Sequence, residues 1–112
     1  MKIELKLTAD EINYLERQTL LVQSIDTNQL PKDKKAAYTI MLDVSDKLMT
    51  KAKQLNRKTD LFDQKKKHKI TLKWHEAETL EQYIDVFSSY QDDPYKANLA
   101  RKVIIQLNQK LA

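Results

Sequence analysis

The segment Lys-Ile-Thr-Leu-Lys-Trp at residues 69–74 decides the fold, because it restates the segment Lys-Ile-Glu-Leu-Lys-Leu at residues 2–7. In both segments apolar residues alternate with polar ones, which is typical of a strand with one buried face. This alternation predicts that Trp74, like Leu7, points into the core. Each segment is followed by two amphipathic helical patterns, so the order β-α-α is predicted twice.

Four helices are expected from the apolar periodicity and from residues typical of helix starts. Thr8 with Glu11 forms a capping-box pattern, Asp33 can cap the second helix, and Asp93 before Pro94 is a typical start of the last one. The four helices are expected to span about residues 9–24, 33–58, 75–90 and 95–111.

We interpret the chain as one β-α-α unit written twice. At an offset of 67 residues Ile70 and Leu72 match Ile3 and Leu5, and at an offset of 63 the prolines and apolar positions of the second and last helices match. Any two amphipathic helices align, but here order, prolines and strands agree together. We therefore predict one helix-rich α+β domain over 1–112, with two short antiparallel strands, related by a pseudo-two-fold axis, packed on four helices. The first repeat covers about 1–58, the linker about 59–67 and the second repeat about 68–112.

Composition excludes several kinds of function. The 112 residues contain no glycine, which phosphate-binding loops, dinucleotide-binding turns and the hydrolase nucleophile elbow need for positive φ and close backbone approach. They contain no cysteine, so disulfides, thiol catalysis and thiolate zinc sites are excluded. There is no apolar run near 18 residues and no signal-peptide core at the start, so we expect a cytoplasmic protein without a transmembrane helix.

No catalytic or metal-binding pattern is present, and we predict no enzyme, no metal and no cofactor. His75 and Glu76 lack the second histidine of the zinc-protease motif, because Thr79 stands one helical turn after His75. The carboxylate in this first turn suits the helix dipole instead. His68 lies among lysines, which disfavour cation binding. A site at the junction of the repeats, with strongly shifted carboxylates or histidines, is the third alternative for function.

Positive charge is concentrated between residues 47 and 73. Ten basic and two acidic residues give this segment a formal charge of +8, and the rest of the chain has −4, for a total of +4. Such a segment can neutralise the phosphates of nucleic acid, and Phe62 and Trp74 could stack on bases. The alternative is a solvated face. The candidate contacts for an anion or nucleic acid are Lys51, Lys53, Arg57, Lys58, Lys65, Lys66, Lys67, Lys69 and Lys73.

The function predicted from these observations is that of a small non-enzymatic interaction protein, an adaptor or structural protein, that binds a protein partner or itself. A two-stranded sheet has two free edges, so an edge-to-edge homodimer is a specific hypothesis. Tyr38 and Tyr95, near the starts of the second and fourth helices, could line a groove at the pseudo-two-fold axis. The alternative function is nucleic-acid binding through the basic segment 47–73. Neither a membrane nor a small-molecule substrate is expected.

Overall fold

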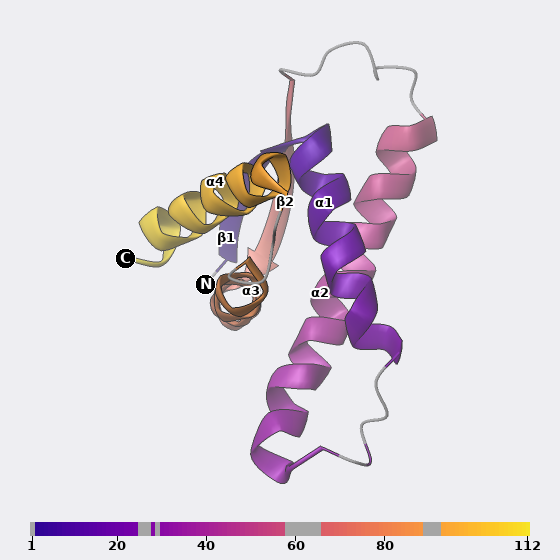
Figure 1. The fold of residues 1–112 in the computed structure, drawn as a ribbon, viewed down its shortest axis with the longest axis vertical. Coiled ribbons are helices and arrows are strands. Elements are labelled where there is room, and N and C mark those ends of the chain that lie inside the picture. The colour runs from indigo at the N-terminus through magenta and orange to yellow at the C-terminus, as the bar shows by residue number, and fades with distance from the viewer. Residues whose placement is uncertain (1, 25–27, 29, 58–65, 89–92) are drawn as a thin grey trace.

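The computed structural model describes residues 2–24, 28, 30–57, 66–88 and 93–112 (Figure 1). The predicted order of two strands and four helices, β-α-α-β-α-α, is confirmed. The elements are β1 (Lys2–Thr8), α1 (Ala9–Leu20), the 3-10 turn η1 (Leu21–Ser24), α2 (Lys32–Arg57), β2 (Lys67–Lys73), α3 (Trp74–Ser88) and α4 (Pro94–Leu111).

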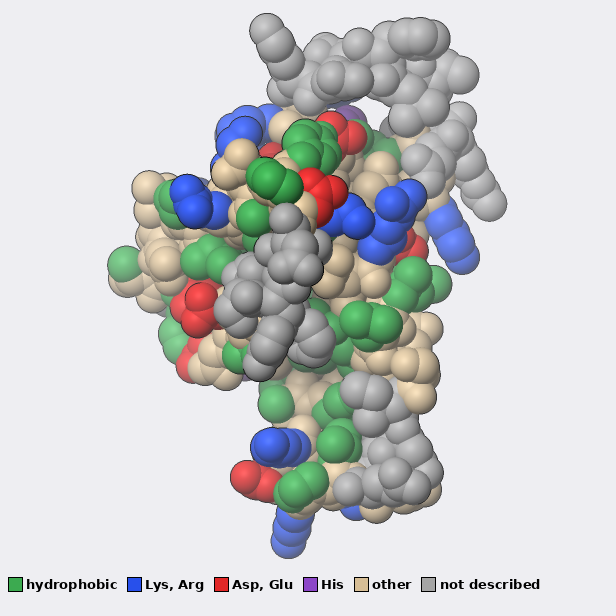
Figure 2. Space-filling model, in the orientation of Figure 1, with side chains coloured by type: hydrophobic (Ala, Val, Ile, Leu, Met, Phe, Trp, Pro, Cys, Tyr) green, Lys and Arg blue, Asp and Glu red, His purple; other side chains and the backbone are tan. Residues whose placement is uncertain are grey.

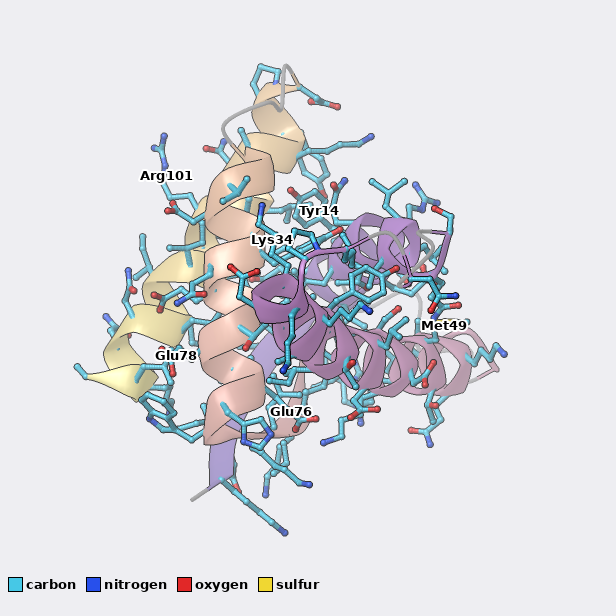
Figure 3. The ribbon with its side chains drawn as sticks, turned by 90° about the horizontal axis from the view of Figure 1, so that it is seen from below. Tyr14, Lys34, Met49, Glu76, Glu78 and Arg101 are labelled. Carbon is cyan, nitrogen blue, oxygen red and sulfur yellow. The ribbon has the colours of Figure 1, made fainter. Side chains whose placement is uncertain are left out.

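The two strands form an antiparallel pair in the middle of the molecule (Figure 1). Leu5 lies opposite Ile70 in the register. One face of the pair is buried, because Ile3, Leu5, Leu7, Ile70 and Leu72 are all at most 6% exposed. The helices lie on this side of the strands, which are seen at one edge of the molecule in Figure 3. Burial of these side chains against the helices supplies the stability that a two-stranded sheet lacks alone.

The helices form two hairpins, α1 with α2 and α3 with α4, to the right and left of the strands in Figure 1. Their inward stripes meet in one core, in which Leu15, Leu48, Leu80 and Leu107 are each at most 1% exposed. α1 and α3 also share a polar contact, because the Tyr83 hydroxyl donates to the carbonyl of Gln18 at 2.6 Å. Burial raises the pKa of Tyr83 to about 12, so this donor keeps its proton.

Two of the three predicted helix caps are confirmed. Thr8 and Glu11 form the complete capping box, with hydrogen bonds of 3.0 and 3.2 Å. Asp93 accepts from the N–H of Tyr95 at 3.0 Å and Pro94 is the first helical residue.

The third cap prediction, Asp33, is wrong. α2 begins at Lys32, and the carbonyl of Pro31 accepts from the N–H groups of Lys34 and Lys35 at 3.0 and 3.1 Å. Asp33 lies inside the first turn, where a carboxylate still favours the helix through its dipole.

The prediction that Trp74 points into the core is also wrong. β2 ends at Lys73, and Trp74 is the first residue of α3 with 39% of its surface exposed. The physical reason is Glu76, whose carboxylate accepts from the N–H of Lys73 at 2.8 Å and so ends the strand. Glu11 does the same for Thr8 at the end of β1. Of the predicted linker, Lys67 belongs to β2, and residues 59–65 lie outside the described part of the chain.

None of the helices in the described ranges is both long enough and apolar enough to cross a lipid bilayer.

Candidate functional site

The solvent-facing side of the sheet is strongly basic. Its side chains alternate along both strands with the buried ones, and each of them is exposed. Five lysines stand against one glutamate, which gives this surface a formal charge of +4. We call this surface the ribbon face; it consists of Lys2, Glu4, Lys6, Lys67, Lys69, Thr71 and Lys73.

Like charges lie directly opposite one another on the ribbon face. Lys2 is the cross-strand neighbour of Lys73, and Lys6 is the neighbour of Lys69. Like charges in such pairs destabilise an antiparallel ladder, by a few tenths of a kcal/mol up to about 1 kcal/mol. The ribbon face therefore concentrates positive charge at a cost to folding stability, and a bound polyanion would relieve the repulsion.

Glu4 partly offsets this charge at the centre of the ribbon face. Its carboxylate lies 2.9 Å from the ammonium of Lys69, and both side chains are about half exposed. The hydrogen bond from Lys69 lowers the pKa of Glu4, and the charges of Lys110 and Lys6 act in the same direction. Lys110 near the end of α4 thus adds to the positive potential beside β1.

A groove lies between β2 and the second half of α2. Its volume is about 340 Å³. Three of its lining residues are lysines and one is an aspartate, so it extends the basic surface beyond the outer edge of β2. The lining residues are Asp46, Lys47, Thr50, Lys51, Gln54, Lys69, Ile70 and Thr71.

Lys47 is held beside this groove by a buried carboxylate. Its ammonium lies 2.6 Å from Glu76 Oε1, and Glu76 is only 3% exposed. Burial acts to raise the pKa of Glu76, but the hydrogen bonds from Lys47 and from the N–H of Lys73 outweigh it, so the pKa lies below its usual value. Glu76 lies at the start of α3 on the side of α2 (Figure 3).

The outer edge of β1 is closed by α4. The side-chain amide of Gln106 accepts from the N–H of Lys6 at 2.7 Å and donates to the carbonyl of Lys6 at 2.9 Å. An amide that satisfies both backbone groups of one residue occupies the position a pairing strand would need.

The predicted basic contacts fall into four groups. Lys67, Lys69 and Lys73 lie on the ribbon face, and Lys66 is exposed directly before it. Lys51 lines the groove, whereas Lys53 is exposed on another face of α2. Outside the described residues or side chains lie Arg57, Lys58, Lys65 and also Phe62.

Sequence reasoning missed two members of this surface, Lys2 and Lys6. Their alternation with Ile3 and Leu5 indicates that they face water, but the cross-strand register alone brings them beside Lys73 and Lys69.

The two tyrosines expected to share a groove lie in separate ones. Tyr38 lines an apolar groove of about 390 Å³ between α2, α3 and the end of α1. Tyr95 lines a polar groove of about 270 Å³ between α1 and α4, where its hydroxyl donates to Asp10 at 2.8 Å. That hydrogen bond raises the pKa of Tyr95. The prediction of one groove that contains both residues is therefore wrong.

Within the described residues, no group of three or more histidines and carboxylates lies close enough to hold a metal ion. Comparison with known proteins adds no relative: no protein-family model matches the chain, and neither a curated protein nor a solved structure is significantly similar to it.

Proposed function

We propose that this chain is a non-enzymatic protein that binds double-stranded DNA through the ribbon face. The observation that supports the proposal is the set of five exposed lysines on a two-stranded antiparallel ribbon, with two like-charge pairs directly opposite. Phosphates neutralise such charges and release condensed counterions, which is the main source of affinity for a basic surface.

The shape of the surface favours duplex DNA over other polyanions. The major groove of B-DNA admits a two-stranded β-ribbon, and the helices here cover only the opposite face of the ribbon. Lys6 and Lys69 at the centre would then approach base edges, where lysine binds guanine. Lys51 on α2 and Lys110 on α4, on either side of the ribbon, would contact the sugar-phosphate backbone.

The test is a fluorescence-anisotropy titration of a labelled mixed-sequence duplex of about 20 base pairs, at about 50 and about 200 mM salt. The variant Lys2→Glu/Lys6→Glu should weaken binding by at least about tenfold and reduce the slope of log Kd against log salt by about two contacts. The control is Lys32→Glu/Lys35→Glu, an equal charge change at exposed positions in the first turns of α2, which should bind nearly as the parent does.

Three results would overturn the proposal. The first is no binding at low salt, and the second is equal loss in both double variants. The third is tighter binding of single-stranded DNA or RNA, which would exclude insertion of the ribbon into a major groove. Trp74, the only tryptophan, follows Lys73 directly and is exposed, so its fluorescence gives a second, label-free signal.

A second candidate function is self-association through the helices. The apolar groove beside Tyr38 is rimmed by Leu21 and Val86, which are 54% and 57% exposed. Figure 2 shows hydrophobic side chains along the lower part of α2, which extends beyond the strands. The edge-to-edge route meets an obstacle, because Gln106 closes β1 and lysines of two ribbon faces would repel.

We propose a second copy of this chain as the occupant of the apolar groove, since an isologous contact pairs this patch with itself. Sedimentation equilibrium should show a dimer that Val86→Asp abolishes. Ile105→Asp, at a 49% exposed position on α4, is the matched control and should leave the dimer intact. A monomer at high concentration would remove this candidate.

We further propose that the chain arose by duplication of a β-α-α unit, with repeats near 1–58 and 68–112. The support is that Glu11 and Glu76, 65 residues apart, each hold the last N–H of the preceding strand. Buried positions of α2 and α4 correspond at a spacing of 59, as in Val44 with Val103. These spacings replace 67 and 63. Superposition of the two halves in an experimental structure tests the proposal, and different helix crossings over the strands would refute it.

A further inference from the structure

The outer edges of the two strands differ in their free hydrogen-bonding groups. In an antiparallel ladder, the N–H and C=O of alternate residues point away from the partner strand. Those of Lys6 do so, because both are bound by Gln106. Lys69 lies directly opposite Lys6 and Thr71 lies two residues further on, so their N–H and C=O groups point outward along the β2 edge.

These outward groups open into the groove beside α2. Lys69 and Thr71 line it from the strand, and Lys47 and Lys51 line it from the helix. Among the described residues, no hydrogen bond reaches the outward backbone groups of Lys69 or Thr71. The β2 edge therefore presents a row of backbone donors and acceptors beside a space of about 340 Å³.

We propose that the β2 edge binds an extended acidic segment of a partner protein as a third strand. Strand addition uses backbone hydrogen bonds for affinity and side-chain contacts on both faces for selectivity. An added strand would place alternate side chains toward the ribbon face, near Lys69, and toward α2, near Lys47 and Lys51. Glutamate or aspartate at both sets of positions fits this charge.

Charge also decides against a second copy at this edge. Another β2 strand would bring Lys69 and its neighbours against their own counterparts, and like charges across a strand pair are destabilising. The inference does not depend on DNA binding, because it uses the edge of β2 and the groove, whereas DNA is proposed to contact the ribbon face.

The test uses a fluorescein-labelled decapeptide of alternating glutamate and threonine at low salt. The parent protein should bind it with a Kd of about 1 mM or below. Amide resonances of Lys69 and Thr71 should shift, and their hydrogen exchange should slow. The same peptide N-methylated at alternate residues keeps its charge but lacks donors, and it should bind at least about tenfold more weakly.

Variants of the protein separate backbone pairing from charge. Thr71→Pro removes the outward N–H without removing a bond to β1, as proline is tolerated at an edge, and it should reduce binding about tenfold. Thr71→Val keeps the N–H and should bind as the parent does. If Thr71→Pro fails to fold, Lys51→Glu, with Lys53→Glu on another face of α2 as control, gives the same comparison.

The proposal is overturned if the parent shows no amide shifts at Lys69 and Thr71 with peptide in millimolar excess. It is also overturned if the N-methylated peptide binds as tightly as the unmodified one, because charge alone would then explain the binding.

Discussion

The two flanks of the sheet are built from the same parts and use them differently. Beside β1, α4 presents Gln106, whose amide binds the N–H and C=O of Lys6. Beside β2, α2 presents Lys47, whose ammonium binds the buried carboxylate of Glu76 instead. An amide both donates and accepts, whereas an ammonium only donates. The choice of one side chain thus closes one edge of the sheet, and the other edge stays open to the solvent.

The largest expected effect comes from the loss of Glu76. Glu76→Ala should lower the free energy of unfolding by about 2 kcal/mol, because it removes two charge-assisted hydrogen bonds and frees Lys47. Glu11→Ala, the matched change at the end of β1, should cost about 1 kcal/mol, the usual value for a cap. Urea unfolding at pH 7 measures both. Equal losses would mean that the Lys47 contact contributes nothing.

The pH dependence should show the same asymmetry. The pKa of Glu76 is lower in the folded chain than its usual value of 4.5. Its contribution is therefore fully present above about pH 4.5 and is lost as the pH falls through the folded pKa. The difference in urea midpoint between the parent and Glu76→Gln should narrow from pH 7 to about pH 3. A constant difference would show that ionisation of Glu76 is irrelevant.

Exchange of the flanking residue should open the β1 edge. Gln106→Lys gives α4 the residue type that α2 has at position 47, and it should cost about 1 kcal/mol through the lost amide bonds. Hydrogen exchange at the Lys6 amide should become as fast as at Thr71. Gln109→Lys, at an exposed position of α4, is the control and should leave Lys6 protected. Unchanged protection in Gln106→Lys would contradict the comparison.

The smallest effect concerns charge on the ribbon face. Lys6→Thr removes one of two opposed lysines and adds a residue with higher β-propensity, so it should stabilise the fold by about 0.3 kcal/mol. It should also weaken DNA binding. Glu4→Thr removes the partner of Lys69 and should give no gain in stability. Thermal unfolding of both variants checks the sign, and a gain in Glu4→Thr would contradict the role of repulsion.

Much of the fold could be predicted because its signals are local. Alternation in β1 and the capping box of Thr8 with Glu11 involve residues within one or two turns of one another. Trp74 was predicted wrongly because the strand continues its alternation through that residue. What ends the strand is Glu76, which also holds Lys47 from another helix, 29 residues away.

The candidate site was predictable only in part. The density of lysine in β2 indicates a basic surface, and alternation assigns Lys69 and Lys73 to solvent. The addition of Lys2 and Lys6 needs the register between two strands separated by two helices. Gln106 has no local signal at all, because a glutamine on an amphipathic helix is ordinary and its partner in the chain is 100 residues away.

The sequence by itself determined that two half-buried strands and four amphipathic helices form, since periodicity and caps act between near neighbours in the chain. It also determined that no glycine-dependent phosphate loop exists. Only the tertiary structure decided which lysines share a surface and which edge of the sheet is closed. Those outcomes depend on the pairing of β1 with β2 and on the docking of α2 and α4 beside them, which are contacts between residues distant in sequence.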